Sequence, residues 1–216
     1  MRISRLLLTG SWAGLLAVLA AWGVLLRIDG NVDNFSYFTQ QSNMLVAGYY
    51  FWQLGYLLIG RERGWRAPPL WLHGAVVVYI IVTGVVYATL LDGSYRQLQD
   101  VLSHAAIPIL VAIDWLIYGP KSTTPRWWYP LSWSVYPVLY LGFILLRAAV
   151  IERPPGSNRY VYPFLNLEAV GAGQFALTVL NFIIGFVALG YLIMGIGKGI
   201  EKVQRTCRNA RYRATS

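Results

Sequence analysis

The chain has 216 residues, of which 56% are hydrophobic and 12% are charged, and its mean hydropathy is +0.49. Soluble domains carry about 25% charged residues, so this composition excludes an ordinary soluble fold and predicts an integral membrane protein. The net charge of +9 fits basic loops and a basic tail lying on anionic lipid. We therefore expect membrane lipids as partners and no nucleic acid.

Six stretches between charged residues are long enough to cross a bilayer, which takes roughly 17 to 25 residues of helix. They are residues 6–26, 34–60, 67–91, 101–119, 127–146 and 169–197, and only Asp114 interrupts the fourth. The connections between them are short. The sequence thus predicts an all-α integral membrane protein, with a single compact bundle of six transmembrane helices in residues 1–200 and a basic cytoplasmic tail in residues 201–216.

The basic residues predict the orientation of the bundle. With a cytoplasmic N-terminus, 13 of the 18 Lys and Arg residues lie on the cytoplasmic side and 5 on the other, as the positive-inside rule favours. Both termini are then cytoplasmic. Arginine outnumbers lysine 15 to 3, which indicates a GC-rich bacterial genome and hence a bacterial cytoplasmic (inner) membrane. Arg2 and Arg5 before the first apolar run also resemble a signal peptide, but the run to Leu26 is long enough that we expect a retained helix.

The second predicted helix opens with five consecutive hydrogen-bonding side chains, from Thr39 to Asn43. An unsatisfied polar group in an apolar medium costs roughly 2 to 7 kcal/mol, so a plain membrane anchor would not carry them. Helical spacing places one set of side chains on a single face, namely Thr39, Ser42, Asn43, Val46, Tyr50 and Gln53. This polar face either lines a site or only bonds to neighbouring helices.

Ionisable residues occur at two depths of the predicted bundle. His104 opens the fourth helix at the depth of Thr39, whereas Asp114 lies roughly 15 Å further along the axis, at the depth of His73. Such residues within spans are candidates for function. We expect His73 and Asp114 to pair as an inner structural lock. His104 is either part of an outer site or is satisfied by nearby polar groups.

The fifth helix and the outer connection after it add polar groups at the outer side. Arg147 ends the fifth helix, where it either clamps a carboxylate or headgroup or extends to the interface. The apolar stretch of residues 160–166 predicts a segment folded back over the mouth of the bundle, as a lid or a re-entrant piece, and Glu168 follows it. The substrate-binding candidates are Asn43, Arg147, Tyr162, Asn166 and Glu168.

A hydroxyl and a histidine at one depth meet the minimum requirement for nucleophilic catalysis. Arg147, Asn43 or a backbone N–H near the start of the second helix could stabilise an oxyanion. Asp92 or Glu168 could orient His104. Two histidines at opposite depths offer no usable ligand set, so we expect no metal. Nucleotide-binding motifs are missing from the sequence, and we expect no cofactor.

Three segments resemble the androgen-induced family of multi-span membrane proteins: Tyr37-Phe38-Thr39, the stretch from His104 to Pro108, and Tyr160-Val161-Tyr162-Pro163-Phe164-Leu165. The order of the segments, the number of spans and the cytoplasmic termini are also similar. The best-understood members are membrane threonine hydrolases that cleave fatty acid esters of hydroxy fatty acids. The resemblance implies Thr39 as nucleophile, His104 as general base and a lipid ester of the fatty acyl class as substrate.

Two other functions fit the same residues. A non-enzymatic carrier or binding protein would use the polar cluster and Arg147 to hold a lipid headgroup or a small solute. A structural subunit of a larger membrane complex would use the polar residues only for packing.

Overall fold

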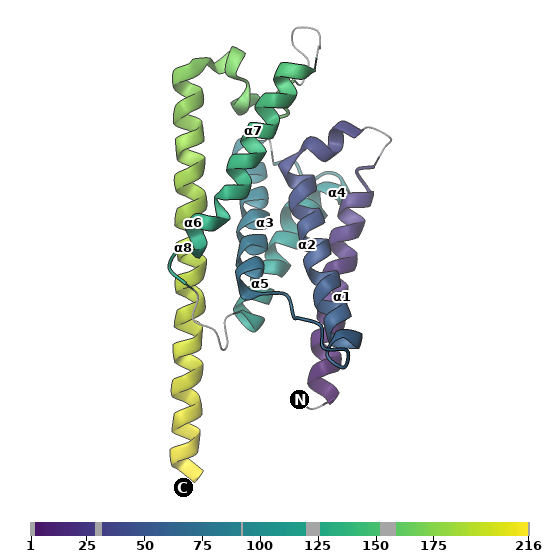
Figure 1. Ribbon diagram of the computed structural model, residues 1–216, viewed down its shortest axis with the longest axis vertical. Coiled ribbons are helices and arrows are strands. Elements are labelled where there is room, and N and C mark those ends of the chain that lie inside the picture. The colour runs from purple at the N-terminus through teal and green to yellow at the C-terminus, as the bar shows by residue number, and fades with distance from the viewer. Residues whose placement is uncertain (1–2, 29–31, 92, 120–125, 152–158, 216) are drawn as a thin grey trace.

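The computed structural model describes residues 3–28, 32–91, 93–119, 126–151 and 159–215, and every regular element in these ranges is helical (Figure 1). The α-helices are α1 (Ile3–Leu25), α2 (Phe38–Gly55), α3 (Leu70–Leu90), α4 (Leu98–Val101), α5 (Ile107–Tyr118), α6 (Tyr129–Trp133), α7 (Val135–Val150) and α8 (Leu167–Thr215). Two 3-10 turns, η1 (Val32–Ser36) and η4 (Pro163–Leu165), and two π turns, η2 (Tyr56–Gly60) and η3 (Leu102–Ala106), complete the order. The predicted all-α fold is confirmed for this part of the chain.

Five helical segments are long and apolar enough to cross a membrane by length and composition. They are Leu6–Leu25, Leu70–Leu90, Leu98–Tyr118, Tyr129–Val150 and Leu167–Val203. Helix α2, which carries the polar face, is not among the five. The first and last described residues lie toward the same end of the molecule, and α8 is kinked at Gly171 and continues from there as a long rod along one side (Figure 1).

Pro137 explains the break inside the fifth predicted span. Proline has no N–H, so it cannot donate to the carbonyl four residues earlier. Pro137 thereby leaves the Trp133 carbonyl free, and the chain breaks between α6 and α7. The Tyr79 hydroxyl of α3 donates to that carbonyl at 2.8 Å. The hydrogen bond from Tyr79 therefore connects α6 to α3 at the position of the break.

Leu16, Val46 and Ile80 of α1, α2 and α3 are fully buried, and the same core extends to α5, α6, α7 and α8. The Asp114 carboxylate of α5 accepts hydrogen bonds from Trp12 at 2.8 Å and from Tyr50 at 2.7 Å.

His73 and Asp114 lie together, as their predicted depths require. The His73 Nε2 atom is 3.0 Å from the Asp114 Oδ2 atom, although the contact does not meet hydrogen-bond geometry. The His73 ring also stacks on Tyr49 with centroids 5.0 Å apart. Asp114 thus joins α5 to three other helices, which is the structural lock expected from the sequence.

Candidate active site

Thr39 lies in the first turn of α2 and is 6% exposed. The helix begins at Phe38 because Tyr37, just before it, has an extended backbone with φ −74° and ψ 134°. Tyr37 provides no side-chain cap, so the first N–H groups of α2 remain available to other acceptors. The Phe38 N–H donates to the Tyr162 hydroxyl at 3.1 Å.

His104 lies in the π turn η3, and Pro108 accounts for the local geometry. Because Pro108 cannot donate to the His104 carbonyl, a regular α-helical bond is missing at this point. The Ile107 N–H donates instead to Leu102, five residues earlier. Single π turns inside α-helices occur frequently at functional sites. Here the turn places the His104 side chain against the start of α2.

Two contacts hold the π turn against its neighbours. The Asn43 Nδ2 atom of α2 donates to the Ser103 carbonyl at 3.4 Å and to the Thr39 carbonyl at 2.9 Å. On the other side, α3 approaches closely at Gly84, where an added Cβ would lie 2.8 Å from the His104 carbonyl oxygen. The lack of a side chain at Gly84 and the amide of Asn43 therefore determine how His104 is placed relative to Thr39.

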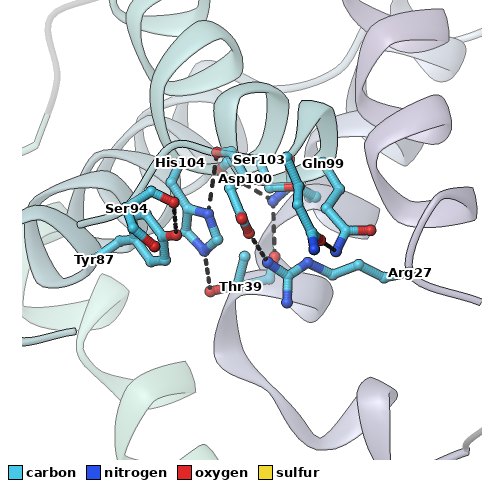
Figure 2. A network of polar contacts seen from close by, with 10 residues as sticks. Arg27, Thr39, Tyr87, Ser94, Gln99, Asp100, Ser103 and His104 are labelled. Atoms are coloured by element: carbon cyan, nitrogen blue, oxygen red, sulfur yellow. Dashed lines mark hydrogen bonds and ion pairs between the residues drawn. The ribbon is translucent and has the colours of Figure 1, made fainter. Parts of the chain in front are cut away.

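The imidazole of His104 links Thr39 to the backbone of Asp100 (Figure 2). Its Nε2 atom is 3.3 Å from the Thr39 Oγ1 atom and its Nδ1 atom is 3.2 Å from the Asp100 carbonyl oxygen. When Nδ1 carries the proton and donates to that carbonyl, the Nε2 lone pair faces the Thr39 hydroxyl. The Tyr87 ring stacks on the imidazole with centroids 3.7 Å apart. This geometry suits a nucleophile with its general base.

An apolar cavity of about 90 Å³ lies beside Thr39. Its walls come from α2, α3, α7, α8 and the lid segment, which we define as residues 160–166. Apart from Thr39, its polar lining residues are Thr83, Tyr140 and Tyr162. The Thr83 hydroxyl donates to the Tyr79 carbonyl at 3.0 Å and the Tyr140 hydroxyl to the Ser36 carbonyl at 2.8 Å. Thr39 therefore provides one of the few polar groups in the wall of a cavity suited to an apolar chain.

Tyr162 is the lid residue that reaches the pair. It is 7% exposed, and burial raises the pKa of its hydroxyl, while hydrogen bonds from Thr39 and Phe38 partly oppose that rise. A pKa above the ordinary value of about 10 keeps this hydroxyl protonated at neutral pH. The structure thus brings together four of the predicted site residues, Thr39, His104, Asn43 and Tyr162.

The other predicted substrate-binding residues lie around the lid segment, away from the pair. Arg147 donates to Asp33 at 2.8 Å and to the Arg159 carbonyl at 2.8 Å. Glu168 accepts from Arg159 at 3.1 Å, and Asn166 accepts from the N–H of Ala169 at 3.1 Å. These contacts hold the lid segment and the start of α8.

The group that orients His104 is a backbone carbonyl, which the sequence could not reveal. Of the two carboxylates considered for that role, Glu168 lies with Arg159, and Asp92 lies outside the described residues. Tyr87 was also missed as a partner of the imidazole. Its position near the outer end of the third span, at the depth of His104, is the signal that could have identified it.

The polar groups around Thr39 provide a nucleophile, a base fixed in one tautomer and an adjacent hydroxyl donor beside an apolar cavity. No model of a known protein family, no curated protein and no solved structure matches this chain.

Proposed function

We propose that the protein is an integral membrane hydrolase of lipid esters of the fatty acyl class, with Thr39 as nucleophile and His104 as general base. The observation that carries this proposal is the 3.3 Å contact between Thr39 Oγ1 and His104 Nε2 beside an apolar cavity. The resemblance of the Thr39, His104 and Tyr160 segments to membrane threonine hydrolases of the androgen-induced family points the same way.

The membrane location is supported by the five long apolar helices and by the burial of the polar face of α2. Gln40 and Asn43 are 0% exposed, so they do not face lipid. Helix α2 and the π turn that continues it cover residues 38–60, about 34 Å at 1.5 Å per residue. That length would cross the roughly 30 Å of hydrocarbon as a sixth span. Six spans put both termini on one side, which the positive-inside rule assigns to the cytoplasm, and the arginine bias favours a bacterial inner membrane.

In the proposed reaction the acyl chain occupies the cavity and the ester carbonyl lies against Thr39. The Thr39 Oγ1 atom attacks the carbonyl carbon as His104 Nε2 takes the hydroxyl proton, and the carbonyl π electrons move to the oxygen. Collapse of this intermediate expels the alcohol, which takes the proton from His104, and leaves an acyl-threonine.

Water completes the cycle. It gives a proton to His104 Nε2 and attacks the acyl carbon, and collapse releases the fatty acid and returns the proton to Thr39. During each step the Nδ1–H of the imidazole donates to the Asp100 carbonyl, which keeps the ring oriented and stabilises the transient imidazolium.

The first test is labelling of the purified protein with a fluorophosphonate probe and mapping of the modified residue. We expect labelling at Thr39, its loss in Thr39→Val and His104→Ala, and its retention in Thr39→Ser. The matched control is Thr83→Val, which removes another buried hydroxyl of the same cavity and should leave labelling intact. Labelling that persists in both Thr39→Val and His104→Ala would contradict the proposal. Tight lipid binding without turnover would instead identify a lipid-binding protein.

A further inference from the structure

The Tyr162 hydroxyl lies on the first turn of α2, the turn that carries Thr39. The Phe38 N–H donates to its oxygen at 3.1 Å, so that bond does not use the phenolic proton. The N–H groups in the first turn of a helix have no acceptor within the helix, and they carry partial positive charge. A phenol that accepts from them becomes a stronger donor through its own O–H, because linked hydrogen bonds polarise one another.

The ring of Tyr162 is held in place by its neighbours. It packs edge-on against Tyr37 with centroids 5.7 Å apart and stacks on Phe164 at 5.2 Å. The nearby Tyr140 hydroxyl is committed to the Ser36 carbonyl at 2.8 Å. Tyr162 therefore places a hydroxyl donor in the cavity wall, next to Thr39. The packing of its ring fixes the direction of that hydroxyl.

The backbone just before Tyr162 is strained. Val161 has φ +67° and, among the described residues, it is the one non-glycine residue with positive φ. A β-branched residue rarely adopts this conformation, and such strain persists where the surrounding structure imposes it, often at active sites. Here Arg147 fixes the segment from outside through the Arg159 carbonyl. The fold therefore maintains an unfavourable conformation next to the residue that touches α2.

We propose that Tyr162 is a catalytic residue, whose O–H donates to the carbonyl oxygen of the ester and stabilises the oxyanion of both tetrahedral intermediates. This inference rests on the proposed ester hydrolysis. When the Thr39 oxygen bonds to the carbonyl carbon, the electron pair of the C=O bond moves to the oxygen. The Tyr162 proton stays on Tyr162 and strengthens its hydrogen bond to that oxygen as charge develops. The Phe38 N–H donates to the phenol oxygen, and through this bond the partial positive charge at the start of α2 also stabilises the oxyanion.

The test compares 4-nitrophenyl octanoate with its thionoester analogue, in which sulfur replaces the carbonyl oxygen and accepts hydrogen bonds weakly. Tyr162→Phe keeps the ring and removes the donor. We expect kcat/KM for the oxygen ester to fall by about 10²- to 10³-fold, the range for loss of one oxyanion donor. The kcat/KM for the thionoester should fall much less, so the ratio of kcat/KM for the oxygen ester to that for the thionoester should decrease strongly. A purely structural defect would lower both substrates equally.

Tyr160→Phe is the matched control, because the Tyr160 hydroxyl faces Glu168 at 3.4 Å; it should leave the rates for both esters unchanged. A thermal unfolding midpoint for each variant shows that the folded protein is being compared. Retention of activity within about threefold, or an equal fall for both esters, in Tyr162→Phe overturns this inference. In that case loss of turnover in Thr39→Val would still support the proposed hydrolase. A wild-type protein that turns over neither ester and is not labelled at Thr39 overturns both.

Discussion

At the scale of single residues, Val179 of α8 is one of the apolar side chains that line the cavity beside Thr39. Val179→Trp fills the cavity, so we expect kcat/KM for 4-nitrophenyl octanoate to fall about tenfold or more, while the acetate ester reacts as before. The neighbouring Leu180 is 52% exposed, and Leu180→Trp is the control that should affect neither ester. Equal rates for both esters in Val179→Trp and the wild type would show that the chain binds elsewhere.

The pairing of Thr39 with His104 could be predicted because depth along a helix follows from counting residues at 1.5 Å each. The Asp100 carbonyl and the Tyr162 hydroxyl could not be assigned their positions in this way. The first is a backbone atom whose position depends on a π turn, and the second depends on the path of an irregular segment. For Arg147 the sequence indicates the chemistry but not the partner. The arginine was expected to bind a substrate carboxylate or headgroup, and in the structure it binds the carboxylate of Asp33 instead.

At the scale of elements, the junction between α3 and the π turn η3 positions His104, the proposed general base. Gly84→Ala would put a Cβ 2.8 Å from the His104 carbonyl, so α3 and the turn must separate. Because displacements of about 1 Å can cost 10²-fold in rate, we expect probe labelling at Thr39 to slow by at least about tenfold. We also expect a loss of about 1–3 kcal/mol in the free energy of unfolding.

Gly48→Ala on α2 is the control for this substitution, because a Cβ at Gly48 meets nothing within 4 Å. It should leave labelling unchanged and stabilise the helix by about 0.5–1 kcal/mol. If both variants label at the wild-type rate, the close approach at Gly84 does not position His104.

The helices themselves were largely predictable from uninterrupted apolar runs, but their internal turns were not. The fourth run begins at Leu98 rather than at residue 101 and contains η3, and the fifth divides at Ser134. Pro108 and Pro137 mark both places in the sequence. Proline indicates that a helical bond is lost, but which side chain or helix approaches the freed carbonyl depends on packing between distant segments.

At the scale of the whole molecule, the Asp114 carboxylate stabilises the contact between α1, α2, α3 and α5. Asp114→Ala leaves the Trp12 and Tyr50 donors and His73 without their partner. We expect a loss of about 3–5 kcal/mol in the free energy of unfolding, as for other buried pairs that lose one member. Thermal unfolding of the purified protein measures this loss.

His104 lies roughly 15 Å from Asp114 along the helix axis, so the folded fraction of Asp114→Ala should still be labelled at Thr39. Glu62→Ala, in the exposed connection after η2, is the control and should change the unfolding free energy by less than about 0.5 kcal/mol. A similar midpoint for both variants would show that Asp114 does not hold the bundle together.

In the proposed hydrolysis the lid segment would have to open, and the positive φ of Val161 would favour that opening. A conformation of this kind costs about 1–3 kcal/mol, and opening the segment releases that cost. At equilibrium this raises the population of the open state by roughly 5- to 150-fold over an unstrained segment with the same contacts. The proposed hydrolysis needs water to enter and a fatty acid to leave, and both steps would depend on that open population. The strain that accompanies the placement of Tyr162 would then also shorten the time for which the product stays bound.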